Sequence, residues 1–316
     1  MSEDEGMEEL ITEEMLWDRI PEVEGEERAS TYYELSARIY ARGQYDEALA
    51  LAETARDIYS QLGDSAPSEG LAQAYSAIGY NLNQLKRMDE AATAMSKAVE
   101  ILRENKSPIA LELACTLGEW WYSSKKYDKV VETMNECAQE HLVDGNEIGA
   151  ANDLHLIGCA ERELKNYEKA IEAFKEARSL FKRNKEVIHV ARCDQKMASC
   201  LIELGEGELA LETARKAVDV FETGHDHRRE TFASFEFGKA QILLEKYDEG
   251  LATLENVLAI VSEDEPKDFE FILDIESRIA KILRMQGRAD EADEIERRLK
   301  SVQEALEDEP ERDLLT

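Results

Sequence analysis

The sequence predicts an all-α protein made of helix-turn-helix repeats that stack one after another as an α-solenoid, preceded by an N-terminal helix. Three observations support this fold class. The 316 residues include only 5 Pro and 16 Gly, which is few helix breakers for a chain of this length. Apolar residues recur at helical spacing, as in Leu71, Ala74, Ile78 and Leu82. Finally, a short run of residues returns about every 40 positions, which indicates a repeat architecture.

Residues 1 to 28 are predicted to form an acidic N-terminal segment that contains one amphipathic helix. They hold 12 acidic and 2 basic side chains. The apolar residues of the segment have the spacing of one helical face ending before Pro21. They are Met7, Leu10, Ile11, Met15, Leu16, Trp17 and Ile20. This helix either caps the first repeat or occupies the protein's own binding groove until a partner displaces it.

Residues 29 to 301 contain the recurring run, of which Tyr45-Asp46-Glu47-Ala48 is typical. Successive copies end 39 to 43 residues apart, a spacing too regular for chance. The copies end at Ala48, Ala91, Val130, Ala170, Ala210, Gly250 and Ala292. The acidic residue of each run belongs in the first turn of a helix, where a carboxylate meets the positive end of the helix dipole. We therefore predict seven helix pairs, with the run at the start of each second helix.

Small residues recur at two further offsets from the end of each run. Twelve residues earlier stand Ser36, Gly79, Gly118, Gly158, Ala198, Gly238 and Ala280, and seven residues later stand Ala55, Ala98, Cys137, Ala177, Ala217, Val257 and Leu299. Helices pack closely only where side chains are small, and the aromatic residue of the run fills the turn between them. Helix breakers fall where a pair should end, at Gly63, Pro67, Pro108, Gly145, Gly224 and Pro266.

This pattern of small residue, turn aromatic, Ala and second Ala resembles the tetratricopeptide repeat from about residue 29 to residue 301. The 40-residue step is longer than the usual 34 and is similar to the longer-helix variety found in cargo adaptors and peptide-sensing regulators. The last repeat departs from the motif at Ala289, Glu296 and Leu299, as a terminal capping repeat would. Gly207 replaces the turn aromatic of the fifth repeat, which is either simple divergence or a point of flexure.

Residues 302 to 316 are predicted to be an acidic, solvated C-terminal tail. The whole chain has 38 Lys and Arg against 70 Asp and Glu, a formal charge of −32. Such a charge argues against direct nucleic acid binding and against an anionic membrane surface, since both depend on Lys and Arg. The chain shows neither a secretory signal nor an apolar run long enough to span a membrane. We therefore expect a soluble, cytoplasmic protein with no membrane contact.

The resemblance implies a right-handed superhelix in which the first helix of each pair lines the concave face. Five positions per pair should face inward, and together these 35 positions carry five acids and five bases. The inner face is thus less acidic than the chain as a whole, an effect that burial alone could produce. Its arrangement is more specific: tyrosines and amides dominate the first repeats, and bases follow further along.

These side chains suit a peptide groove, because tyrosines give contact area at low entropy cost, amides pair with backbone groups and bases attract carboxylates. The predicted partner-binding residues are Tyr33, Tyr40, Tyr80, Asn83, Tyr122, Asn152, His155, Arg162, Arg192 and Gln195. Further inward positions include Ile202, Lys239, Ile242, Leu243, Lys281, Arg284 and Met285.

No catalytic or nucleotide-binding motif occurs, so we predict neither an enzyme nor a cofactor. His225-Asp226-His227 offers one edge of a metal site without an evident third ligand, and no metal is predicted. His155 and Cys159 are one helical turn apart, but a groove residue above a small packing residue is the simpler interpretation. The five cysteines are odd in number and lack a Cys-x-x-Cys pair, which favours reduced core residues.

The sequence thus predicts a protein-protein interaction scaffold or adaptor that binds a peptide or helical segment of a partner protein in its concave groove. One alternative is an acidic nucleic-acid mimic that inhibits a basic partner. Another is a self-associating assembly factor, which would make the chain a homo-oligomer. Binding that weakens steeply with salt would favour the mimic, whereas an aromatic and amide groove is less sensitive.

Overall fold

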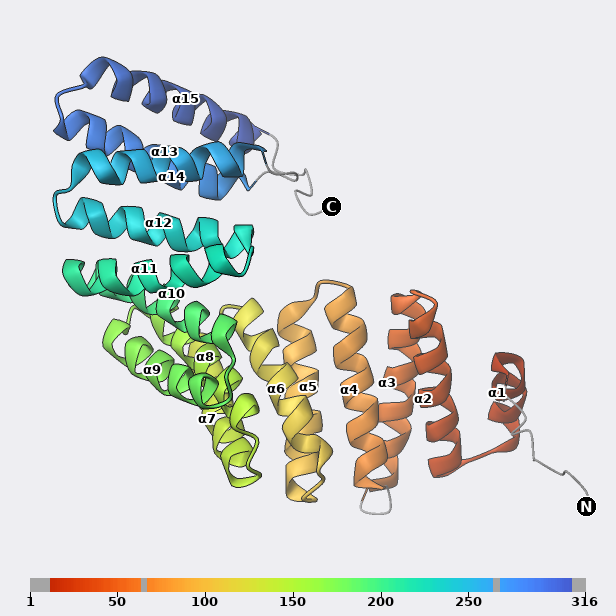
Figure 1. Cartoon of the computed structure of the whole chain (residues 1–316). Coiled ribbons are helices and arrows are strands. Elements are labelled where there is room, and N and C mark those ends of the chain that lie inside the picture. Colours follow the sequence, from red (N-terminus) through yellow and green to blue (C-terminus); the bar gives the residue numbers. More distant parts are fainter. Residues whose placement is uncertain (1–11, 64–66, 264–267, 309–316) are drawn as a thin grey trace, which may run out of the picture. The chain divides into compact units, whose positions relative to one another are not determined.

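The computed structural model describes residues 12–63, 67–263 and 268–308, and within these ranges every regular element is helical (Figure 1). The all-α prediction is confirmed. The helices are α1 (Glu13–Arg19), α2 (Gly25–Ala41), α3 (Tyr45–Leu62), α4 (Ser68–Gln84), α5 (Met88–Glu104), α6 (Ile109–Ser123), α7 (Tyr127–Val143), α8 (Glu147–Glu163), α9 (Tyr167–Arg183), α10 (Val187–Glu203), α11 (Gly207–Thr223), α12 (His227–Leu243), α13 (Tyr247–Glu263), α14 (Phe269–Met285) and α15 (Ala289–Asp308), with a 3-10 turn η1 (Ile20–Glu22) after α1. Residues 1–11, Pro266 and residues 309–316, on which parts of the sequence analysis rest, lie outside the described residues.

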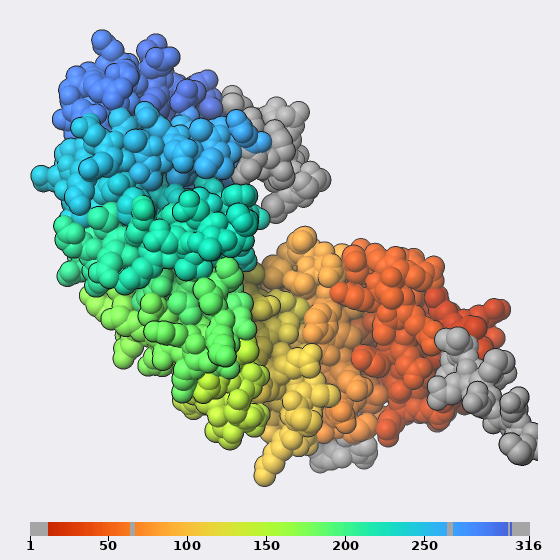
Figure 2. All heavy atoms as spheres, viewed as in Figure 1, coloured from red at the N-terminus to blue at the C-terminus, as the bar shows by residue number. Residues whose placement is uncertain are grey.

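Two compact units make up the chain, one ending at Gly145 and one beginning at Asn146. The N-terminal unit contains α1 and the pairs α2–α3, α4–α5 and α6–α7, and the C-terminal unit contains the pairs α8–α9, α10–α11, α12–α13 and α14–α15. Within each unit each helix contacts the next one along the chain, from α1 to α7 and from α8 to α15. The first helices also meet across pairs, since α2 contacts α4 and α10 contacts both α8 and α12. Pairs of one unit therefore form adjoining layers, visible as adjoining bands of colour in Figure 2.

Every second helix begins within its sequence run, as predicted. Tyr45, Met88, Tyr127, Tyr167, Gly207, Tyr247 and Ala289 are the first residues of the seven second helices. The acidic residue that follows each of them lies in the first helical turn, for example Asp46 in α3 and Glu168 in α9. These carboxylates therefore lie at the positive ends of the helix dipoles, as predicted.

Left-handed backbone conformations recur in both turns of the repeat. Five residues before the end of each run the backbone angle φ is positive at Gly43, Lys86, Lys125, Lys165, Gly205, Glu245 and Gly287, and fifteen residues after it φ is positive at Gly63, Lys106, Gly145, Lys185 and His225. In the first of these turns the amide after the left-handed residue donates to a carbonyl five residues back, as Asn166 N does to Glu161 O at 2.8 Å. This hydrogen bond is that of a Schellman motif, which ends the first helix of the pair.

The small residue twelve positions before the end of each run lies at a close helix contact. A Cβ atom added to Gly158 of α8 would lie 2.6 Å from Cε1 of Phe174, whose ring in α9 is fully buried. At Gly238 of α12 the nearest atom would be Cδ2 of Leu254, at 3.0 Å. Glycine therefore permits the two helices of a pair to approach where a larger side chain would collide.

Gly207 has a packing role of its own. It is buried at the start of α11, and an added Cβ would lie 2.8 Å from Cδ2 of Leu244, which follows α12. A larger side chain at this position would therefore collide with Leu244 of the next pair.

Helix α1 packs on the first helix pair. Leu16 and Ile20 are buried in a cluster with Leu35, Ile39 and Leu51 of α2 and α3. Two ion pairs join the same segments, Arg42 to Glu13 at 2.7 Å and Arg19 to Glu27 at 2.5 Å. The described part of the N-terminal segment therefore covers apolar surface of the first pair.

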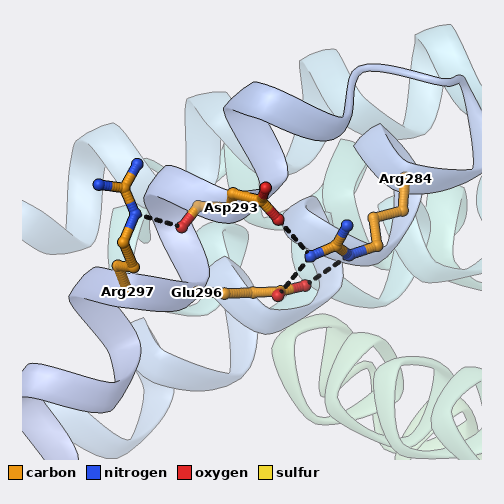
Figure 3. A network of polar contacts seen from close by, with 4 residues as sticks. All are labelled: Arg284, Asp293, Glu296 and Arg297. Carbon is orange, nitrogen blue, oxygen red and sulfur yellow. Dashed lines mark hydrogen bonds and ion pairs between the residues drawn. The ribbon is translucent and has the colours of Figure 1, made fainter.

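The last pair is held by an ion network shown in Figure 3. Arg284 at the end of α14 donates to Glu296 of α15 through Nε and Nη2, at 2.9 and 2.7 Å, and to Asp293 at 2.5 Å. Arg297 donates to the Asp293 carbonyl at 3.1 Å. The sequence offsets counted Arg284 among the inward bases, but its guanidinium is engaged by the second helix of its own pair.

Candidate binding surfaces on the first helices

The ten predicted binding residues divide equally between the two units. Tyr33, Tyr40, Tyr80, Asn83 and Tyr122 lie on α2, α4 and α6, and Asn152, His155, Arg162, Arg192 and Gln195 lie on α8 and α10. We call these the aromatic surface and the basic surface. Nine of the ten side chains are half-buried and Asn152 is exposed.

The aromatic surface is continuous across its three helices. Gln84 Nε2 of α4 donates to Tyr40 Oη of α2 at 3.1 Å. On the other side of α4 the Tyr80 ring stands perpendicular to that of Trp120 in α6, with centroids 5.4 Å apart. The Tyr80 hydroxyl also hydrogen-bonds to Thr116 of α6. These contacts fix the orientation of the tyrosines, so the surface is largely ordered before anything binds.

Two tyrosines of this surface also pack against the aromatic residues of the turns. Tyr40 packs edge-on against Tyr45 and Tyr122 against Tyr127, with centroids 5.3 and 5.5 Å apart. Each pair joins the end of a first helix to the start of the second helix that follows it. Burial raises the pKa of Tyr33 and of Tyr80, so both remain neutral hydrogen-bonding groups at physiological pH.

The basic surface is centred on His155 of α8. Its Nδ1 lies 3.8 Å from Cys159 Sγ, and its ring packs edge-on against Phe174. Nε2 is buried and has no hydrogen-bond partner among the described residues. Burial lowers the pKa of His155 to about 3, and the positive charges of Arg192 and Lys196 act in the same direction. The imidazole is therefore neutral in the folded protein at neutral pH.

Lys196 belongs to this surface, although the sequence offsets did not select it. It follows Arg192 by one helical turn on α10, and burial lowers its pKa, with Arg162 adding to the effect. Glu236 on α12 is the acid that acts on it in the opposite sense. The i, i+4 spacing from Arg192 was the signal in the sequence, since such residues share a helix face. Arg162, Arg192 and Lys196 are hereafter the basic cluster.

The thiols near the basic cluster are protonated at neutral pH. Burial raises the pKa of Cys159, and it raises those of Cys193 and Cys200 to about 12. A thiol at neutral pH is a poor nucleophile and a poor metal ligand. With a neutral imidazole beside it, Cys159 is not activated as a thiolate. None of the five cysteines, all of which lie in the described ranges, forms a disulfide bond, and all but Cys115 are buried.

The His225-Asp226-His227 sequence forms the turn and the N-cap at the start of α12. Asp226 accepts from the backbone N–H of Arg229 at 3.2 Å as the helix N-cap, and its carboxylate also pairs with the Arg229 side chain. His225 is the left-handed residue of the turn, and His227 pairs with Glu230 at 3.3 Å. Asp226 and His227 thus have structural partners within the first turn of α12.

Two family models for the tetratricopeptide repeat match the chain, at residues 27–104 and 154–182. The matches cover the first two helix pairs and part of the fourth. Together with the stacked helix pairs they show that the chain belongs to the tetratricopeptide-repeat superfamily. A comparison with curated proteins gave no match.

Several solved structures share the fold. A signal transduction ATPase with numerous domains, with a tetratricopeptide repeat sensor, from Pyrococcus horikoshii is 18% identical, with a TM-score of 0.65 over 94% of this chain and 45% of its own. The apo form of RapI is 15% identical, with a TM-score of 0.57 over 89% and 99%. Aspartyl phosphate phosphatase F from Bacillus subtilis is 14% identical, with a TM-score of 0.56 over 87% and 71%. The chain thus spans less than half of the Pyrococcus protein.

Tetratricopeptide repeats are generally a non-enzymatic fold for protein-protein interaction. In the described ranges, each helix is too short or too polar to cross a lipid bilayer.

Proposed function

We propose that this protein is an interaction scaffold that binds a peptide or helical segment of a partner protein on the surfaces of its first helices. The observation that carries the proposal is the aromatic surface, where tyrosine and amide side chains of α2, α4 and α6 interlock while staying partly exposed. Side chains that are held in place but still accessible lose little entropy when a partner binds.

The chemistry of the two surfaces supports a polypeptide partner. Asn83 and Asn152 present amide groups that can pair with the backbone of a bound segment, and the tyrosines present both apolar faces and hydroxyls. Within the basic cluster Arg162 pairs with Glu163 at 2.6 Å, and Arg192 and Lys196 add positive charge to a chain whose formal charge is −32. We therefore expect the partner segment to be apolar in part and acidic in part.

The test compares two double variants, each of which removes two surface amides. Asn83→Ala with Asn152→Ala alters the first helices α4 and α8, and the control Asn135→Ala with Asn256→Ala alters the second helices α7 and α13. Wild type and both variants are used for affinity capture from the native cell lysate, and the affinity of each captured protein is then measured. We expect the first variant to bind a captured partner at least about fivefold more weakly and the control to bind it like wild type.

Equal retention by both variants would move the binding site away from the first helices. The same measurement at about 50 and 200 mM salt separates this proposal from the charge-mimic alternative, whose affinity should fall steeply over that range.

A further inference from the structure

The C-terminal unit has a hollow in the surface of its first helices, beyond the predicted binding residues. Its volume is about 260 Å³, and its walls come from α10, α12 and α14. Small-molecule sites have volumes of about 300 to 1,000 Å³. This hollow is below that range, so it suits an anchoring side chain of a larger partner better than a whole cofactor.

Apolar side chains form most of the lining of the hollow. Ile202 and Ile242 are half-buried. Leu243 and Met285 are 39% and 63% exposed. Burial of such exposed apolar groups by a partner makes a favourable contribution to the free energy of binding. Methionine also adapts its shape to different partners.

Three cations also line the hollow, and only one of them lacks a counter-charge. Lys239 is buried and pairs with Glu236 at 2.8 Å, and Arg278 pairs with Asp274 at 2.9 Å. Both also lie over the Phe235 ring. Lys281 is exposed and makes no hydrogen bond or ion pair with any of the described residues. A single available ammonium group therefore stands beside an apolar depression.

We propose that this hollow binds a protein segment that presents a carboxylate side chain within one helical turn of a leucine, isoleucine or methionine. The apolar side chain would fill the depression, and the carboxylate would pair with Lys281. The inference rests on the proposed scaffold function and specifies one chemical feature of the partner.

Charge complementarity favours this occupant over others. The chain as a whole repels acidic segments, because its formal charge is −32. Lys281 offsets that repulsion locally, and it would repel a lysine or arginine of a basic segment. The hollow thus selects its partner segment in two ways: Lys281 attracts an acidic side chain and repels a basic one.

The experiment selects peptides from a phage-displayed library of random 12-residue sequences on the immobilised full-length protein. The enriched peptides are synthesised with a fluorescent label, and their affinities are measured by fluorescence anisotropy. We expect an acidic residue within four positions of Leu, Ile or Met in the enriched sequences. We also expect about tenfold weaker binding to a Lys281→Glu variant, in which an attraction becomes a repulsion.

Lys300→Glu is the charge control, since it makes the same charge change on α15, where Lys300 is 78% exposed and has only an exposed pair with Glu304 of the same helix at 3.7 Å. It should bind within about twofold of wild type. Replacing the acidic residue of the peptide by lysine should restore binding to Lys281→Glu. Thermal unfolding followed by circular dichroism verifies that both variants are folded.

The site proposal is overturned if Lys281→Glu binds the enriched peptides as tightly as Lys300→Glu does, or if the peptides lack the acidic and apolar combination. If such peptides instead depend on Asn83 and Asn152, the scaffold function stands without this site. If no peptide is enriched, both proposals fall.

Discussion

His155 shows how the environment of one residue sets its chemistry. The positive charges of Arg192, Lys196 and Arg162 act on the imidazole, whose Nε2 is buried, and its pKa is about 3 in the folded protein against about 6.5 in an unfolded chain. The unfolded state therefore binds a proton between these two values and the folded state does not. The contribution of the neutral His155 to the free energy of unfolding is therefore fully present above pH 6.5 and is lost as the pH falls toward 3.

We predict that lowering the pH from 8 to 5.5 reduces the free energy of unfolding by about 1 to 2 kcal/mol through His155 alone. This pH remains above the isoelectric point of about 4.5. The measurement is urea denaturation of wild type and of His155→Gln at both pH values, with His227→Gln as an exposed control. The pH-dependent difference should shrink in His155→Gln and persist in His227→Gln. An unchanged difference in His155→Gln would contradict the assigned role of burial.

The candidate site could be predicted from the sequence only in part. Repeat offsets assigned His155, Arg162 and Arg192 to first helices, and these helices form as expected. Lys196 was missed because it sits at an offset that the five inward positions do not include. Its relation to Arg162 depends on how α8 and α10 pack, which a single-helix pattern does not describe.

At the scale of the element, the turns are the most regular feature of the repeat. In the turn between the first and second helices, glycine occupies the left-handed position in three pairs, lysine in three and glutamate in one. A residue with a Cβ atom adopts this conformation at a cost of about 1 to 2 kcal/mol. Sequence reasoning found the turns through their aromatic residues and glycines, and it did not identify Lys86, Lys125 and Lys165 as left-handed.

We predict that Lys165→Gly raises the free energy of unfolding by about 0.5 to 1 kcal/mol, because glycine accepts its φ of 62° without steric cost. The matched change Lys175→Gly in the interior of α9 should lower the free energy of unfolding by about 1 kcal/mol. Chemical denaturation of the two variants in parallel with wild type measures both effects. The opposite signs are the critical result, and two destabilising changes would argue against strain at position 165.

The small residues show why the positions of the helix pairs could be predicted from the sequence, whereas the side-chain contacts between the two helices of a pair could not. Gly158 and Gly238 occupy equivalent positions, yet one faces the rigid ring of Phe174 and the other the flexible side chain of Leu254. The repeat pattern requires a small residue at both places. The tolerance of each to a larger residue depends on the neighbour, which only the packed structure identifies.

At the scale of the whole molecule, the net charge of −32 governs behaviour in solution. Self-repulsion of like charges destabilises a compact state, and salt screens it over a distance of about 10 Å at 0.1 M. The first-helix surfaces interrupt this acidity with the basic cluster and with Lys281. Binding by these surfaces is therefore expected to differ in salt dependence from binding by the remaining surface.

We predict that raising NaCl from about 20 to 500 mM raises the melting temperature by several degrees, because screening weakens the repulsion. Differential scanning fluorimetry over a salt series measures the shift. A variant in which Glu172, Glu176 and Glu222 become Gln should have a higher melting temperature at low salt and a smaller salt response, since these exposed acids lie beyond the first turns of α9 and α11. A melting temperature that falls with added salt would show that attractive ion pairs outweigh the repulsion.

The sequence by itself determined the class of this protein and the positions of its seven helix pairs, because helix formation and close helix contact depend on residue types at short, fixed offsets. It also determined the acidity of the chain and the helices that carry its bases. Tertiary structure alone decided the partners of those side chains: Arg284 is engaged by Glu296 and Asp293, whereas Lys281, one turn earlier, is not. The reason is physical. Contacts between different helices depend on distances of a few ångströms that packing sets, and neighbouring residues of one helix meet entirely different surroundings.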